Sequence, residues 1–326
     1  MTQDPACPAW TTPEELALAR VWAVARLGAL GIVALGEWRV VKQGAISVVW
    51  RQATSAGDVF FKAVPKLFAP EPPLTEWLGG RWPAYIAPVL AVDRAQRWML
   101  TRAVEGIVLS DVDTPETWTS TVRALARIQI DSVGHMGVMT VRGCPVRSLA
   151  SLPGELDAVL KRAVPRCMGT EHGVPDALVR AIGARRDALE ADAERLAGYR
   201  LPVTLIHGDF VPGNVIVAAG SGVPVLLDWT DGACAHPFFD LLVFLRGRAR
   251  CMTAHHGALV DAYLAEWSAA GAGLVPVLRE AFTLAQRLAP LYHAASYGRI
   301  MELGPAAVTE LGSVLRWLLG MLAEGV

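Results

Sequence analysis

One short polar segment, residues 207–214, constrains this chain more than any other feature of its sequence. It reads His-Gly-Asp-Phe-Val-Pro-Gly-Asn and lies between two apolar stretches that are each short enough to be a buried strand. A third apolar stretch follows and ends at Asp228. A loop with Asp209 and Asn214 five residues apart, and an aspartate at the end of a neighbouring strand, predicts three oxygen-bearing side chains facing one point.

The chemistry of these three side chains suits phosphoryl transfer. Asn214 and Asp228 are oxygen ligands of the kind that hold Mg²⁺ together with substrate phosphates, because Mg²⁺ takes few protein oxygens. Asp209 is then free to orient and deprotonate a hydroxyl group, which is the arrangement used by kinases.

A two-metal phosphoesterase is the competing interpretation, since it also uses Gly-Asp and Gly-Asn loops. That chemistry needs an upstream Asp-x-His pair and a histidine directly after Asn214. Val215 stands at that position, and the sequence holds no Asp-x-His. The phosphotransferase hypothesis is therefore favoured.

The pattern HGDxxxxN, then Leu-Asp-Trp, then a further aspartate resembles that of the aminoglycoside phosphotransferase family, which is also similar to choline, homoserine and fructosamine kinases. The resemblance implies that Asp209 is the catalytic base and that Asn214 and Asp228 are metal ligands. It also implies that His207 orders the catalytic loop and that Asp240 is a buried anchor for it.

This resemblance implies an α+β, bilobal protein-kinase-like fold. The sequence agrees, because short strands separated by glycine turns fill the first part and helical patterns dominate the remainder. The composition changes near residue 104. We therefore expect a nucleotide-binding lobe over 1–104, with an N-terminal helix and five antiparallel strands, and a mainly helical catalytic lobe over 105–326.

Lys62 is the candidate for the phosphate-gripping lysine. It lies in an apolar strand, and a buried lysine needs a partner or a ligand because an unpaired buried charge is costly. In kinases such a lysine pairs with a helix glutamate. Glu76 is the preferred partner here and Glu71 the alternative.

Two further nucleotide-binding segments are expected. Gly44, Ala45 and Ser47 form a glycine-poor loop whose backbone N–H groups would cover phosphates. The stretch that joins the lobes would bind the adenine edge through the backbone of Arg102 and Val104. A plain hairpin turn is the alternative interpretation for the loop.

The acceptor site is expected beside Asp209, with contributions from Asp231, His293 and Tyr297. Residues 230–326 hold eight acidic residues and seven arginines, a balanced set. A polycationic aminoglycoside would have to exchange its hydration for carboxylates, so we expect such compounds to be poor substrates.

Composition restricts the partners further. A formal net charge of -1 and a pI near 6.7 favour neither a nucleic-acid partner nor an anionic membrane. Five cysteines without a CxxC pair indicate neither a zinc site nor a disulfide framework, and no signal-like start or uninterrupted apolar span is present. We therefore expect a cytoplasmic enzyme.

The predicted enzyme uses ATP or GTP with Mg²⁺ and phosphorylates a small hydroxyl-bearing molecule. An antibiotic kinase acting on an aminoglycoside or a macrolide is the alternative, and a catalytically silent nucleotide-binding module is a further one. The sequence leaves the acceptor, the nucleotide preference and the oligomeric state open.

Overall fold

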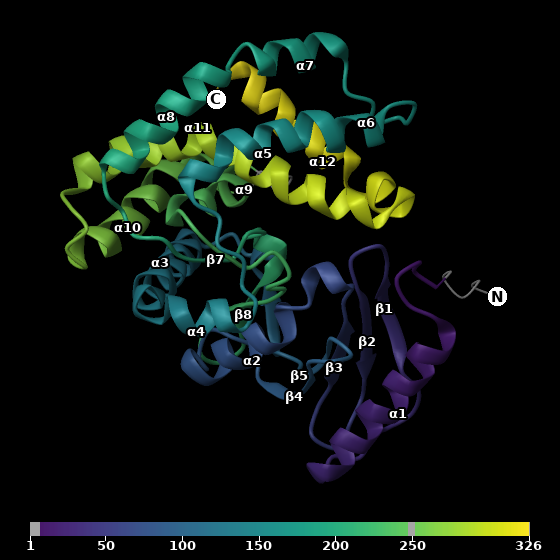
Figure 1. Ribbon diagram of the computed structural model, residues 1–326. Helices are drawn as coiled ribbons and strands as arrows, with labels where there is room; N and C mark the ends of the chain where they lie inside the picture. The colour runs from purple at the N-terminus through teal and green to yellow at the C-terminus, as the bar shows by residue number, and fades with distance from the viewer. Residues whose placement is uncertain (1–6, 247–251, 326) are drawn as a thin grey trace.

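The computed structural model describes residues 7–246 and 252–325. Its N-terminal part is a five-stranded antiparallel sheet with the strand order β1-β2-β3-β5-β4 (Figure 1). The strands are β1 (Arg39–Gln43), β2 (Val48–Gln52), β3 (Val59–Ala63), β4 (Val89–Asp93) and β5 (Trp98–Arg102). The expected α+β architecture is confirmed, since an antiparallel sheet precedes a mostly helical part.

Helix α1 (Pro13–Ala29) begins at a capping box, in which the Thr12 hydroxyl accepts from the Glu15 N–H and the Glu15 carboxylate accepts from the Thr12 N–H. Its buried residues Ala19, Ala23 and Leu27 recur every four positions, so they share one face. That face packs on the sheet, against a cluster that includes Val48, Trp50, Val59, Phe61, Trp98 and Leu100.

Helix α2 (Glu71–Arg81) connects β3 to β4 and packs against β4. After β5 the chain enters the second part, where β6 (Gly106–Val108) joins a three-stranded sheet with β8 (Val215–Ala218) and β9 (Pro224–Leu226). Strand β7 (Thr204–Ile206) pairs with β10 (Ala233–Ala235). The three apolar stretches around the polar segment are thus short strands, as expected.

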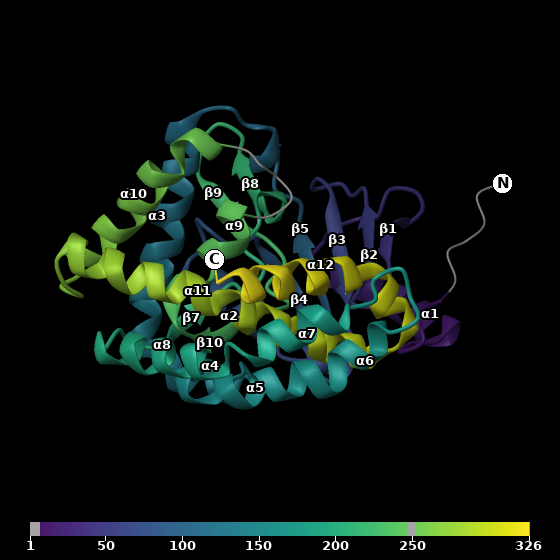
Figure 2. The same cartoon turned by 90° about the horizontal axis from the view of Figure 1, so that it is seen from above.

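Helices make up the remainder of the second part (Figures 1 and 2). They are α3 (Pro115–Ser132), α4 (Met136–Val141), α5 (Leu152–Ala158), α6 (Val164–Cys167), α7 (Asp176–Gly183), α8 (Arg186–Gly198), α9 (Leu241–Arg246), α10 (His256–Ala269), α11 (Val275–Ile300) and α12 (Pro305–Glu324). Helix α12 is long and apolar enough, by length and composition, to cross a membrane, but it packs along α11 and 44% of its most apolar window is buried.

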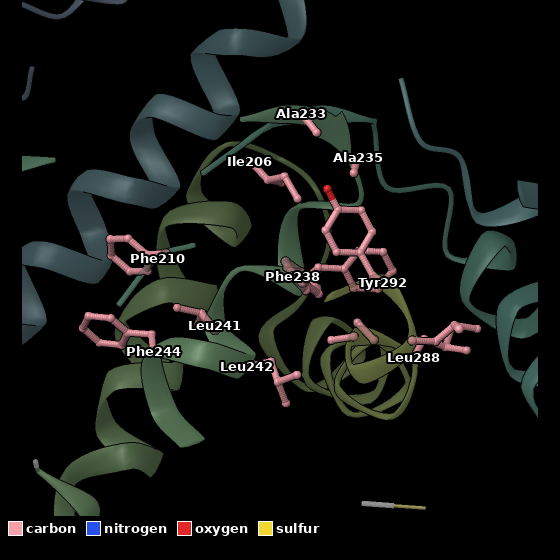
Figure 3. Packing of buried hydrophobic residues seen from close by; sticks show 14 of the residues in the cluster. Ile206, Phe210, Ala233, Ala235, Phe238, Leu241, Leu242, Phe244, Leu288 and Tyr292 are labelled. Atoms are coloured by element: carbon pink, nitrogen blue, oxygen red, sulfur yellow. The ribbon is translucent and has the colours of Figure 1, made fainter. Parts of the chain in front are cut away.

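Aromatic and aliphatic side chains together form the part of the core that supports the polar segment (Figure 3). Phe210, within that segment, stacks on Phe244 of α9 with ring centroids 4.6 Å apart. Phe239 stacks on Tyr292 of α11 at 5.1 Å. Both pairs are buried, and the first attaches the loop to the helical core by the hydrophobic effect and by ring packing.

Candidate active site

The loop that follows β7 is held by a buried carboxylate. The two oxygens of Asp240 accept hydrogen bonds from the backbone N–H groups of His207 and Gly208, both at 2.8 Å, and the side chain of Gln129 donates to Asp240 at 3.0 Å. Asp240 has no exposed surface. These contacts immobilise the backbone immediately before Asp209.

His207 connects this loop to the segment after β9 that carries Asp228. Its Nε2 lies 2.8 Å from the carbonyl oxygen of Leu227, and burial lowers the pKa of His207 to about 4. A neutral ring with Nε2–H donating to that carbonyl fits this environment. This hydrogen bond ties the loop to Leu227, the residue directly before Asp228.

Glycine is required at position 208 because both the backbone conformation and the lack of room for a side chain disfavour other residues. Its φ is +81°, and a Cβ at this position would stand 2.2 Å from the carbonyl oxygen of Asp231. The backbone of the loop and the segment after Asp228 are therefore in direct contact.

Asp209 and Asn214 face one another across this loop. The Asn214 side-chain amide donates to the Asp209 backbone oxygen at 2.9 Å and to its carboxylate at 3.1 Å. Burial, and then repulsion by Asp228, raise the pKa of Asp209 to about 6. Such a carboxylate is largely ionised at neutral pH yet basic enough to accept a proton, as a general base requires.

Asn214 and Asp228 provide a donor set that fits Mg²⁺. Since the Asn214 amide nitrogen donates to Asp209, its Oδ1 remains as an acceptor, and the Leu227 N–H bonds to the Asn214 carbonyl oxygen at 2.8 Å. This bond places Asp228, the next residue, beside Asn214. One amide oxygen and one carboxylate are the few protein oxygens that Mg²⁺ needs when phosphates supply others.

Lys62 lies at the centre of a buried polar cluster. Its ammonium donates to Glu71 Oε1 at 2.6 Å, to Asp228 Oδ1 at 2.7 Å and to Thr230 Oγ1 at 2.7 Å. Burial alone would lower the pKa of Lys62, but attraction to Asp228 and Glu71 raises it, so the group stays charged. Attraction to Lys62 outweighs burial at Asp228 as well and lowers the pKa of that carboxyl.

The prediction that Glu76 pairs with Lys62 was wrong. Glu76 lies on the exposed side of α2, where its carboxylate pairs with Arg94 at 3.0 Å. Glu71, the alternative, begins the same helix and its side chain is buried against Lys62. Five residues turn an α-helix by about 140° beyond a full turn, so the two glutamates cannot share a face.

The loop between β1 and β2 makes a tight turn, in which the Gly44 N–H donates to the Ser47 carbonyl at 3.0 Å. The next N–H, that of Ala45, donates to the Glu310 carboxylate at 2.9 Å. Ser47 itself is buried.

Arg102 and Val104 were expected to bind the adenine edge through their backbone groups. The Arg102 N–H donates to the Pro88 carbonyl oxygen at 2.8 Å and its guanidinium to the Ala56 carbonyl at 2.9 Å. Its N–H is therefore already used within the sheet. Val104 follows the end of β5 and stays a prediction.

A cavity of about 650 Å³ opens at the Asp209 carboxylate. Its wall is mostly apolar and includes Val211, Val243, Leu311, Val314 and Trp317. Tyr297 lies in this wall with its hydroxyl 3.5 Å from Asp209 Oδ1, and Arg246 and Glu310 add one charge of each sign.

The other two residues expected at the acceptor site, His293 and Asp231, do not line this cavity. The expectation for His293 was wrong, because its side chain is fully buried and its Nε2 lies 3.0 Å from the Phe239 carbonyl oxygen. Asp231 lines a separate cavity of about 170 Å³ that Arg147 and Glu71 also line. Burial, and then the charges of Asp209 and Asp228, raise the pKa of Asp231 to about 8. Its role toward an acceptor stays a prediction.

Thr230 and Glu310 were missed from the sequence. Thr230 follows Asp228 by two residues, so the short Asp-Trp-Thr-Asp run was a signal that could have been used. Glu310 lies about a hundred residues from the polar segment, on a helix with no motif. Only the packing of α12 brings it to the loop of Gly44.

A small antiparallel sheet joined to a larger helical part, with a lysine of the sheet bonded to the carboxylate of Asp228 in the helical part, is the arrangement of a kinase-like fold. The chain belongs to the phosphotransferase enzyme family, whose model matches residues 37–280. The resemblance noted in the sequence is thereby confirmed, and the protein is a phosphotransferase. A sequence search of curated proteins finds no match.

Solved structures support the fold at low sequence identity. A choline kinase from Cryptosporidium parvum is similar with a TM-score of 0.67 at 10% identity, covering 94% of this chain and 96% of that one. A macrolide 2'-phosphotransferase type I has a TM-score of 0.57 at 15% identity, covering 94% and 98%. An aminoglycoside phosphotransferase from Streptomyces rimosus, in complex with ADP and streptomycin, has a TM-score of 0.51 at 20% identity, covering 83% and 97%.

Proposed function

We propose that this enzyme transfers the γ-phosphoryl group of ATP or GTP to a hydroxyl group of a small molecule bound in the 650 Å³ cavity. The observation that carries the proposal is the position of Asp209. Its carboxylate lines this cavity and is also hydrogen-bonded to Asn214, which lies beside Asp228 and the Lys62 cluster. An acceptor in the cavity and phosphates at Lys62 would therefore meet at Asp209.

Each side chain then has a defined task. Lys62 binds nucleotide phosphates, and Glu71 keeps its ammonium in place. Asn214 and Asp228 hold Mg²⁺, which neutralises phosphate charge when bound. Asp209 accepts the hydroxyl proton of the acceptor, while Asp240 and His207 hold the loop rigid. The location in the cytoplasm also stays a prediction.

The cavity favours an acceptor with an apolar face over a polycation. Of its two carboxylates, Asp209 and Glu310, only one is balanced by Arg246, and most of its remaining wall is apolar. A ligand with several ammonium groups would leave some of them unpaired, and each unpaired buried charge costs several kcal/mol. Among antibiotics, a macrolide, with its large apolar ring, suits this wall better than an aminoglycoside.

A phosphorylation screen tests the proposal. The purified protein with Mg·ATP and Mg·GTP is offered macrolides, aminoglycosides, amino alcohols and sugars, and phosphorylated product is detected by mass spectrometry. We expect one hydroxyl compound with an apolar face to be phosphorylated. Asp209→Asn should lower kcat by about 10²–10⁴-fold, whereas Asp113→Asn, an exposed aspartate before α3, should not. Equal turnover in both variants would refute the role of Asp209.

A further inference from the structure

Helix α12 of the second part reaches the loop between β1 and β2 of the first. In both views the start of α12 lies near the tip of this hairpin (Figures 1 and 2). An apolar cluster joins them: Ala45 of the loop and Phe68 are packed with Ile300 and Ala307. The contact therefore has a hydrophobic base that holds α12 in place.

The carboxylate of Glu310 lies next to this apolar cluster, at the turn. Glu310 Oε1 accepts a hydrogen bond from the Ala45 N–H at 2.9 Å. The same oxygen lies so near Gly44 that a Cβ on that residue would stand 2.8 Å from it. The missing side chain of Gly44 thus permits a negatively charged group to lie directly on the turn.

An outward-facing N–H in a tight turn is the group that binds phosphate oxygens in nucleotide sites. A carboxylate and a phosphate cannot both take the same short N–H bond, and two negative charges at that distance repel. On the proposed function, the β- or γ-phosphate of the nucleotide belongs at this turn. The Glu310 carboxylate therefore lies where a nucleotide phosphate is expected.

We propose that Glu310 is a determinant of nucleotide affinity that competes with the nucleotide phosphates for the Ala45 N–H. Because its side chain also lines the acceptor cavity, phosphate binding displaces the carboxylate toward that cavity. There it can accept a hydrogen bond from the acceptor. By linkage, an acceptor that binds the displaced carboxylate strengthens nucleotide binding to the same degree. This inference rests on the proposed function for the location of the phosphates.

Calorimetric titration of three ligands tests the competition without any acceptor. Adenosine, Mg·ADP and a Mg-bound non-hydrolysable ATP analogue are titrated into the wild type, Glu310→Gln and Glu310→Ala. Glu324→Gln, at an exposed position of the same helix, is the matched control. We expect both phosphate-bearing ligands to bind about tenfold more tightly to Glu310→Ala, the equivalent of one charged hydrogen bond. Adenosine should bind equally to all four proteins.

Glu310→Gln separates charge from packing, because it keeps the size and one acceptor oxygen of the side chain but removes the charge. We expect it to bind phosphate-bearing ligands more tightly than the wild type but less tightly than Glu310→Ala. Unchanged or weaker Mg·ADP binding by both variants would overturn the inference, as would a gain that adenosine shares. Failure of the acceptor screen would refute the proposed function and leave this result intact.

Discussion

Glu71→Gln is expected to weaken Mg·ADP binding and to lower stability, and Glu76→Gln is its matched control on the same helix. Lys62 has three donor hydrogens and three acceptors, the side chains of Glu71, Asp228 and Thr230. The glutamine keeps an oxygen for Lys62 but removes the charge from a side chain that is 1% exposed. A hydrogen bond to a charged group contributes about 1.5–3 kcal/mol.

Two measurements follow from this magnitude. The free energy of unfolding in urea should fall by about 1.5–3 kcal/mol, and the Kd for Mg·ADP should rise by about tenfold or more. The nucleotide effect arises because a neutral glutamine attracts the Lys62 ammonium less than Glu71 does, so the ammonium is held more by Asp228 and less in the position from which it would reach the phosphates. Glu76 pairs with Arg94 at an exposed position, where such a pair is worth about 0–1 kcal/mol.

The comparison of the two variants decides the assignment. Equal losses in Glu71→Gln and Glu76→Gln would refute the argument that burial and the 2.6 Å contact make Glu71 the functional partner. So would a Glu71→Gln protein with normal stability and normal nucleotide affinity.

Three further predictions concern Asp228 and the loop of residues 207–214. Asp228→Ala should remove the Mg²⁺ dependence of ATP binding, because Asp228 is the carboxylate proposed to hold the metal. Calorimetry with and without Mg²⁺ measures this dependence. An unchanged dependence on Mg²⁺ would contradict the prediction. Asp209, the proposed base, must be deprotonated to act, and its pKa is raised to about 6. The kcat/KM for the acceptor identified by the screen should therefore fall about tenfold per pH unit below about pH 6. A rate that stays level down to about pH 4.5 would exclude Asp209 as the titrating base. Gly208→Ala should destabilise the fold by more than about 3 kcal/mol, since the alanine Cβ would overlap the Asp231 carbonyl oxygen and the φ of this residue is positive. A melting temperature within about 2 °C of the wild type would contradict this and show that the loop can move.

The sequence alone predicted the elements that depend on short-range spacing. The polar segment, its flanking strands and the aspartate 14 residues after Asn214 are close in the chain. Their meeting requires only two short strands to pair side by side, as Val215 and Leu226 do. The pattern of small and apolar residues likewise indicated the five-stranded sheet, because alternation and glycine turns are local signals.

Side chains whose position depends on helix packing could not be predicted in this way. His293 and Tyr297 lie one turn apart on α11, yet one is buried against Phe239 while the other lies beside Asp209. The neighbours of each side chain depend on how α11 is rotated about its axis when it packs against the loop and the strands. A single sequence does not determine that rotation.

The sequence by itself therefore determined the family and the loop that carries Asp209, because those depend on residues within a short stretch of chain. Only the tertiary structure decided that Glu71 pairs with Lys62 and that Glu310 lies on the turn at Gly44. The first contact joins a strand of the sheet to a helix and the second joins a loop of the sheet to a helix. In each, the choice of partner depends on which face of the helix packs inward. Glu310 and Ala45 are 265 residues apart, so their contact exists only once α12 has packed against the loop.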